Sequence, residues 1–163
     1  MLQFALVGQV SIQSVFVENQ INPQGIASVA PRFSWKLASN QRNVAQQAYS
    51  IQVKSGSKIV WNSGKVMSNQ SIFVPYAGLA LESNRQYHVA VQVWDQAGKA
   101  SVVSKSSFST AFLNVADWKA KWISSGIPAD KEAGPVPIFT KSFVAAKSVR
   151  QARLFITSRG LYE

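Results

Sequence analysis

The chain has no cysteine and only one histidine, His88, among its 163 residues. The absence of cysteine excludes disulfide bonds and thiolate metal sites. It leaves the compartment open, because a periplasmic or secreted bacterial protein need not contain disulfides. A metal site or a catalytic triad built on His88 would have no second imidazole and no thiolate to draw on. We therefore expect neither a metal nor a cofactor.

Acidic residues are also few, and the seven of them lie scattered at positions 18, 82, 95, 117, 130, 132 and 163. Hydrolysis of a glycosidic bond needs two carboxylates on opposite sides of that bond, and no such pair stands out. We expect Asp95 to form a turn and Asp117 to form a cap or a turn. The nine glycines are isolated, so a Gly-rich phosphate loop is also absent. The sequence therefore predicts no catalytic residue in this chain.

Long hydrophobic runs are missing as well. No stretch approaches the roughly 18 apolar residues that a membrane span requires. The segment Met1–Val10 is fairly apolar, but it has no Lys or Arg before its apolar run, and Gln3, Gly8 and Gln9 interrupt it. We predict no membrane span and no clear signal peptide here. A signal removed before this numbering starts would be compatible with a periplasmic or secreted bacterial protein.

Basic residues outnumber acidic ones by 17 to 7, which gives a net charge of +10. The excess is spread along the chain, and its longest cluster is only Lys119 with Lys121. A nucleic-acid-binding protein usually concentrates its charge on one face or helix, so we predict no nucleic-acid binding. Two interpretations stay open: a soluble surface that is basic without further purpose, or attraction to an acidic polymer such as a uronic-acid polysaccharide.

The strongest pattern in the chain lies between Leu81 and Gly98. From Tyr87 to Val93 every second residue is Tyr or Val, which is the period of a strand with one buried face, and Asp95 to Gly98 supply turn residues. A Leu six residues before such a Tyr is typical of the tyrosine corner of sandwich domains, where the ring is buried and its hydroxyl bonds to nearby backbone. The pattern indicates a β-sandwich.

Short alternating segments separated by Gly, Asn, Ser and Pro turns continue this pattern through the first 112 residues. We predict seven strands, at residues 10–18, 32–37, 48–55, 58–61, 71–76, 86–95 and 105–112. The fourth should form a hairpin with the third. This spacing is typical of an all-β, immunoglobulin-like or fibronectin type III-like sandwich, which we assign to residues 1–112.

The pattern changes after Phe112. We expect a helical turn capped by Asn114, a loop over 125–137, and two further strands at 138–143 and 152–157. Two strands cannot bury a core alone, so residues 113–163 are interpreted as a linker and the truncated start of a second β-sandwich domain. Its apolar strands should pack on the first domain or on a second copy, which would give self-association.

The sequence contains five tryptophans, at positions 35, 61, 94, 118 and 122. Flat aromatic rings suit the apolar faces of sugars, but the first is expected in the core and the last two at a packed domain junction. For Trp61 and Trp94 the pattern does not decide between a core position and a surface position. Trp94 shares the more polar side of its strand with His88. Trp61, Trp94 and His88 are therefore the candidates for a carbohydrate or interdomain contact.

Eight short motifs occur in a characteristic order and span nearly the whole chain. They are Pro31-Arg-Phe-Ser-Trp35, Gln47-Ala-Tyr-Ser-Ile-Gln-Val53, Trp61-Asn-Ser-Gly-Lys-Val66, Tyr76-Ala-Gly78, Val91-Gln-Val-Trp-Asp95 with Gly98, Asp117-Trp118, Trp122-Ile123, and Ala152-Arg-Leu-Phe-Ile-Thr157 with Gly160-Leu-Tyr-Glu163. Together they resemble the N-terminal region of bacterial α-L-rhamnosidases of glycoside hydrolase family 78. The departures are small: Asn62 stands where the family often has Asp, and His88 where an aromatic residue is common.

The resemblance implies a multidomain glycosidase. In that family a fibronectin-like domain precedes a jelly roll resembling a carbohydrate-binding module, further β domains and an (α/α)6 barrel. The barrel carries a Glu general acid and a Glu general base, and hydrolysis inverts the anomeric carbon. Nothing in this sequence matches the barrel, so no catalytic residue is carried over. The family's usual continuation after Gly160-Leu-Tyr-Glu163 is missing, from which we expect a fragment.

Two functional hypotheses follow. The first is the non-catalytic N-terminal part of an α-L-rhamnosidase-like glycosidase, whose whole form would hydrolyse terminal α-L-rhamnosyl linkages in plant glycans. Its partners would then be the remaining domains and a rhamnose-containing polysaccharide. The second is a stand-alone β-sandwich module that binds carbohydrate or protein and has no enzymatic activity.

Overall fold

The structure, a computed structural model, describes residues 10–126, 137–150 and 152–159. The chain divides into two units, residues 1–119 and residues 120–163. Within the described residues, every strand lies in the first unit.

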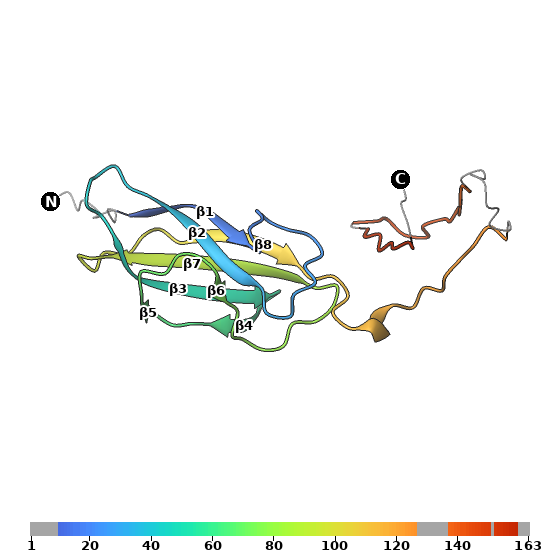
Figure 1. Ribbon diagram of the computed structural model, residues 1–163, viewed down its shortest axis with the longest axis horizontal. Coiled ribbons are helices and arrows are strands. Elements are labelled where there is room, and N and C mark those ends of the chain that lie inside the picture. Colours follow the sequence, from blue (N-terminus) through green and yellow to red (C-terminus); the bar gives the residue numbers. More distant parts are fainter. Residues whose placement is uncertain (1–9, 127–136, 151, 160–163) are drawn as a thin grey trace. The chain divides into compact units, whose positions relative to one another are not determined.

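The first unit is a sandwich of two antiparallel sheets (Figure 1). Its strands are β1 (Ser11–Val17), β2 (Arg32–Ala38), β3 (Gln46–Ser55), β4 (Lys58–Asn62), β5 (Val66–Met67), β6 (Val74–Pro75), β7 (Gln86–Asp95) and β8 (Ser104–Ser109). One sheet has the order β1-β2-β6 and the other β4-β3-β7-β8, with β5 also paired to β3. The predicted all-β, immunoglobulin-like sandwich is confirmed.

The core lies between the two sheets and is supplied by alternate residues of the strands. On β7, Tyr87, Val89, Val91 and Val93 are each at most 1% exposed, as their period of two predicts. Phe33 on β2 packs onto them from the other sheet, with its ring 6.2 Å from that of Phe108. The opposite face of β7 is therefore the outer face of the larger sheet.

The predicted tyrosine corner is present. Tyr87 begins the buried row of β7, and its hydroxyl accepts a hydrogen bond of 2.8 Å from the backbone N–H of Glu82. Leu81 is half-buried against the core cluster. The corner holds the segment before β7 against the end of the sandwich.

Trp35 occupies the predicted core position and brings a polar partner with it. Its indole N–H donates a 2.8 Å hydrogen bond to Oε1 of Gln46, which is also buried. The amide of Gln46 then donates to the carbonyl oxygens of Ser68 and Gln70 at 3.1 and 2.9 Å. A buried polar group must be paired in this way, since an unpaired one costs about 1–3 kcal/mol.

Several predicted strand boundaries in this unit were wrong. The segment 71–76 is strand only at Val74–Pro75, because Phe73 has a φ of 53°, which no pleated strand accommodates. The last predicted strand ends at Ser109, where the following residue forms an isolated bridge to Ile26. The short strand β5 was not predicted, because two residues carry no detectable period.

The short helical turn after Asn114 is present as a 3₁₀ turn, Val115–Asp117. Asn114 is the N-cap residue of this turn, as predicted, but its side chain makes no capping hydrogen bond. Within the described residues this turn is the only helical segment.

The second unit differs from expectation in its local structure. The predicted strands at 138–143 and 152–157 are not formed, since no residue described there is assigned to a strand. Phe143 and Leu154 are 84% and 83% exposed. A strand needs a hydrogen-bonded neighbour and a covered apolar face, and the apolar side chains of Phe143 and Leu154 are not covered. The described residues of this unit therefore do not show the second β-sandwich domain.

Candidate functional site

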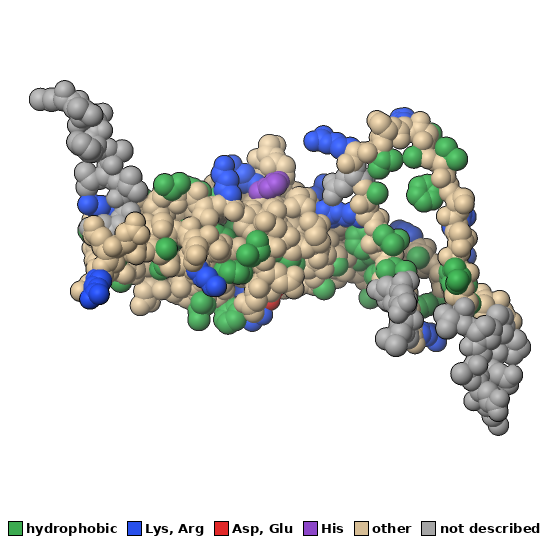
Figure 2. Space-filling model, turned by 90° about the horizontal axis from the view of Figure 1, so that it is seen from above, with side chains coloured by type: hydrophobic (Ala, Val, Ile, Leu, Met, Phe, Trp, Pro, Cys, Tyr) green, Lys and Arg blue, Asp and Glu red, His purple; other side chains and the backbone are tan. Residues whose placement is uncertain are grey.

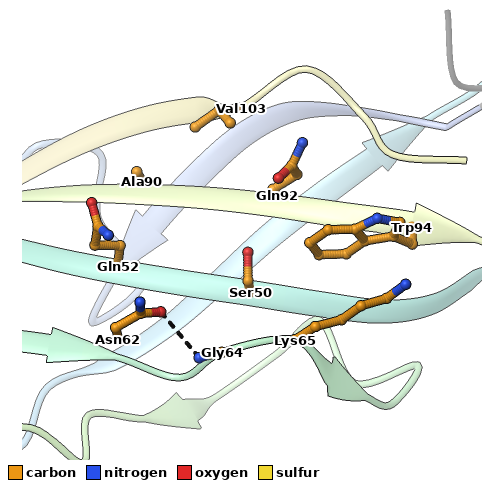
Figure 3. Close-up of a pocket in the computed structure, with 9 residues that line it drawn as sticks. All are labelled: Ser50, Gln52, Asn62, Gly64, Lys65, Ala90, Gln92, Trp94 and Val103. Carbon is orange, nitrogen blue, oxygen red and sulfur yellow. Dashed lines mark hydrogen bonds between the residues drawn. The ribbon is translucent and has the colours of Figure 1, made fainter.

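A shallow hollow lies on the outer face of the larger sheet (Figure 3). Its volume is about 370 Å³. It is lined by Ser50, Gln52, Asn62, Gly64, Lys65, Ala90, Gln92, Trp94 and Val103. Strands β3 and β7 form its floor, because the even-numbered residues of β7 and those of β3 from Ser50 onward point away from the core. Such a floor is rigid, and it presents side chains at fixed spacing.

Much of the polar lining is available for a ligand. The amide nitrogen of Gln92 is used, since it donates to the carbonyl of Ser101 at 2.8 Å, and Oδ1 of Asn62 accepts from the N–H of Gly64 at 3.0 Å. Among the residues that the structure describes, the side chains of Ser50 and Gln52 make no hydrogen bond. The hollow therefore offers a hydroxyl and an amide to a bound molecule.

An aromatic ring and a cation close one end of the hollow. Nζ of Lys65 lies 4.7 Å from the ring centroid of Trp94, a cation–π contact. Trp94 is half-buried although it stands on the outer face of β7. Figure 3 shows the side chain of Lys65 running along the ring rather than away from it. The pair combines a flat apolar surface with a positive charge.

Further basic groups lie on the same face. The register pairs Lys54 of β3 with His88 of β7, and Ala90 of β7 with Lys105 of β8. Directly paired residues of antiparallel strands share a face, so Lys54, His88 and Lys105 all stand on the outer side of this sheet. In the view of Figure 2 the histidine lies at the surface beside basic side chains.

The carboxylates of the described residues are all engaged in structural contacts. Glu18 pairs with Arg32 at 2.7 Å, and Glu82 pairs with Arg85. The hydrogen bond from the Arg32 guanidinium holds the pKa of Glu18 below its ordinary value. Buried Asp95 accepts 2.9 Å bonds from the N–H groups of Ala97 and Lys99, which confirms its predicted turn role.

No acidic side chain lines the hollow, which therefore has no carboxylate of its own for acid–base catalysis. No group of three or more His, Cys, Asp or Glu side chains suited to a metal ion occurs in the described residues. In those same parts of the chain no helix has the length and apolarity needed to cross a membrane.

The three residues singled out from the sequence are not brought together. Trp61 of β4 points to the core side, where its ring stacks on Phe33 at 5.9 Å and meets Tyr76 edge-on at 5.3 Å. Trp94 lines the hollow on the outer face. His88 is exposed on that same face but outside the lining. Only Trp94 thus belongs to the site.

Sequence reasoning missed most of the lining. Ser50 and Gln52 had a detectable signal, because they alternate with the buried row of β3 and mark its polar face. Lys65 had none. It follows a turn in which Gly64 has a φ of 63°, and it approaches Trp94 only after β5 pairs with β3.

A second cluster fixes the point where the chain leaves the sandwich. The hydroxyl of Ser83 donates to the carboxylate of Asp117 and accepts a 2.8 Å bond from the N–H of Leu113. The rings of Phe112 and Trp118 meet edge-on with centroids 5.0 Å apart. We refer to Ser83, Phe112, Leu113, Asp117 and Trp118 as the exit clasp. It holds the chain beyond β8 to the tyrosine corner region.

The model of the Rha78A-like N-terminal immunoglobulin domain matches residues 12–114 of this chain. That range covers all eight strands from β1 to β8 apart from the first residue of β1. The chain belongs to this family. The structure of the Rha78A-like immunoglobulin domain is therefore the sandwich described above, with the hollow on its larger sheet.

The relatives of this Rha78A-like domain are larger enzymes. An α-L-rhamnosidase of Streptomyces avermitilis is 39% identical over 123 residues, which are 72% of this chain and 12% of that protein. An α-L-rhamnosidase of Formosa agariphila is 35% identical over 159 residues, which are 87% of this chain and 17% of that protein. The chain thus spans less than a fifth of the length of these relatives.

Solved structures agree with the sequence comparison. The Streptomyces avermitilis α-L-rhamnosidase, solved in complex with L-rhamnose, superposes with a TM-score of 0.68 and 39% identity over 71% of this chain and 12% of that one. The α-L-rhamnosidase of Dictyoglumus thermophilum gives a TM-score of 0.66 and 34% identity over 70% of this chain and 14% of that one. The Rha78A-like immunoglobulin domain corresponds to the N-terminal part of such enzymes.

Proposed function

We propose that this chain is the non-catalytic N-terminal portion of a larger α-L-rhamnosidase, and that the whole enzyme hydrolyses terminal α-L-rhamnosyl linkages in plant glycans. The match of residues 12–114 to the Rha78A-like domain carries this proposal. The engagement of the described carboxylates in turns and ion pairs supports the non-catalytic role, because glycoside hydrolysis needs two carboxylates free to face one bond.

In this proposal residues 1–112 are the sandwich, and residues 113–163 are a linker followed by the start of a carbohydrate-binding-module-like β domain. The apolar side chains of the second segment support it. Phe139, Phe143 and Leu154 are all more than half exposed, and they would become the buried face of strands once the remaining domains supply paired neighbours. The main partner of this chain is then the rest of its own enzyme, and self-association through these exposed apolar segments is an alternative for the isolated chain.

The role proposed for the sandwich is to position the following domain. The exit clasp supports this role, because two hydrogen bonds to Ser83 tie the chain after β8 to the sandwich. The contact between the rings of Phe112 and Trp118 fixes the conformation of that exit segment. A linker that is held at its first residues limits the orientations open to the domain behind it.

The test has two parts. The 163-residue chain is assayed on an aryl α-L-rhamnoside, and no turnover is expected; measurable turnover that co-purifies with the chain would contradict the non-catalytic role. The reading frame beyond Glu163 is then sequenced. Several hundred further residues with a helical, Trp- and Glu-rich segment are expected, and a stop codon directly after Glu163 would favour a stand-alone module.

The hollow at Trp94 supports a second candidate function, that of a β-sandwich module that binds carbohydrate and has no enzymatic activity. Isothermal titration of the chain with rhamnose and rhamnogalacturonan fragments separates the two. Binding tighter than about 1 mM would favour a binding module, and weaker binding a purely structural one.

A further inference from the structure

We infer that the hollow on the outer face of β4-β3-β7-β8 is a subsite for an anionic sugar, a hexuronate residue of an acidic glycan, with Trp94 as the stacking platform and Lys65 as the carboxylate partner. This inference does not depend on the enzyme activity proposed above. It concerns binding by the sandwich alone.

The first step is the shape and chemistry of the hollow. Its volume of about 370 Å³ leaves room for one sugar residue, which in so shallow a hollow would keep one face in solvent. Ser50 and Gln52 rise from its floor and, within the described part of the chain, have no hydrogen-bond partner. Sugars present several hydroxyl groups in a plane, and each can exchange a hydrogen bond with a hydroxyl or amide group of this kind.

The second step is the platform. Trp94 is a large, half-buried apolar ring on the outer side of a sheet, and Nζ of Lys65 lies over it, 4.7 Å from its centroid. A sugar stacks on that face once the flexible Lys65 side chain moves to the edge of the ring. A pyranose ring has an apolar face of C–H groups that matches an indole surface. The nearby ammonium group can meet a carboxylate on the same sugar, and this charge-assisted hydrogen bond is stronger than a neutral one. A neutral sugar would use the ring and leave Lys65 unmatched.

The third step is the charge of the whole face. Lys54, Lys105 and His88 stand on the same side of the sheet as the hollow, while the four described carboxylates are all engaged elsewhere. None of the carboxylates in the described ranges therefore neutralises the positive charge of this face. A polymer with a negative charge on successive sugars complements that face as well as the hollow. The dispersed excess of basic residues in the sequence thus has a local consequence here.

The experiment is a titration of the purified chain with a galacturonate trisaccharide, followed by isothermal calorimetry and by the amide and indole signals in NMR spectra. We expect saturable binding, with shifts at the indole N–H of Trp94 and at the backbone of Gln52 and Gln92. The methyl-esterified trisaccharide should bind at least about fivefold more weakly, because its carboxylates are neutral. Equal binding of both sugars would overturn the role of charge.

Variants locate the site. Trp94→Ala should weaken binding about tenfold, and Lys65→Gln should weaken the acidic sugar several-fold while leaving the esterified one unchanged. Gln52→Ala is a second probe of the floor that leaves the ring in place. The matched control is Lys36→Gln, since Lys36 makes a similar contact with Phe16, at 5.6 Å, on the other sheet. If Lys36→Gln weakens binding as much as Lys65→Gln, the attraction is non-specific and the inference fails.

Two further outcomes would overturn the inference. An absence of binding up to about 5 mM sugar would mean that the hollow takes no free glycan, whatever the activity of the parent enzyme. An oligodeoxynucleotide that binds as tightly as the acidic sugar and is displaced in parallel by salt would identify a general polyanion surface. Neither outcome bears on whether the chain itself turns over a rhamnoside, so this test and the test of the proposed function fail independently.

Discussion

The hydroxyl of Tyr87 accepts a 2.8 Å hydrogen bond from the backbone N–H of Glu82, five residues earlier in the chain. The phenol ring is 1% exposed and stacks on Phe108 with centroids 5.1 Å apart. One side chain thus joins the segment before β7 to the core between the sheets. Glu82 also accepts a hydrogen bond from Thr110 at its carbonyl oxygen, so the same corner holds the end of β8.

Tyr87→Phe should destabilise the sandwich by about 1–2 kcal/mol, because the N–H of Glu82 loses a partner in a partly buried place. The measurement is urea unfolding followed by tryptophan fluorescence. Tyr49→Phe is the control. Tyr49 is also a core residue, but among the described residues its hydroxyl makes no hydrogen bond, so we expect a change within about 0.5 kcal/mol. Equal effects of both changes would show that the corner hydrogen bond contributes nothing.

Gly78→Ala should destabilise the domain although Gly78 lies in an exposed turn. A Cβ there would come within 2.5 Å of the carbonyl oxygen of Val60, of Cβ of Trp61 and of the hydroxyl of Tyr76. Two of these atoms belong to or adjoin the backbone and cannot move aside cheaply, so we expect a loss of about 1–3 kcal/mol. Thermal unfolding checks this. The neighbouring Ala80→Ser is the control, with an expected change below about 0.5 kcal/mol.

Stability should fall at alkaline pH because of Tyr76. Burial raises the pKa of Tyr76 to about 12, and its hydroxyl donates to the carbonyl oxygen of Leu79 at 2.7 Å. The unfolded phenol has a pKa of about 10, so the folded state binds more protons in the interval. Its contribution is complete below about pH 10 and is lost as pH rises through about 12.

The measurement for Tyr76 is the free energy of unfolding as a function of pH, together with the ultraviolet absorbance of tyrosinate. The wild-type domain should lose stability between about pH 10 and 12 more steeply than Tyr76→Phe. Identical slopes for the two proteins would assign the alkaline loss to other groups.

The exit clasp should open when Ser83 is replaced by Ala. Ser83→Ala removes the donor to Asp117 and the acceptor of the Leu113 N–H. Hydrogen exchange at Leu113 should become about tenfold faster, which corresponds to about 1.4 kcal/mol of local stability, while exchange within β7 stays unchanged. Ser57→Ala, in the exposed turn between β3 and β4, is the control. Unchanged exchange at Leu113 would mean that the hydrogen bonds of Ser83 do not hold the exit segment.

Much of this fold can be predicted from the sequence because one sheet face is buried. A buried face imposes a period of two on the side chains. β7 carries that period along its whole length and β3 carries it from Tyr49 to Val53, so the existence, type and facing of both strands were predicted correctly. The tyrosine corner was also predictable, since it depends on a spacing of six residues between Leu81 and Tyr87. The short elements were not predictable from the sequence. Strand β5 and the interruption at Phe73 depend on pairing and on one backbone angle, and neither leaves a periodic trace.

The candidate site likewise has one part that the sequence predicts and another that it does not. Alternation along β7 was enough to place Trp94 and His88 on one outer face and to place the valines inside. Three facts needed the tertiary structure: Trp61 turns toward Phe33 and Tyr76, Lys65 reaches Trp94 from a separate turn, and Gln46 satisfies the buried indole of Trp35. Local periodicity states which side of a strand a residue occupies. Which residues from other strands meet it there depends on sheet order and register, and long-range pairing decides these.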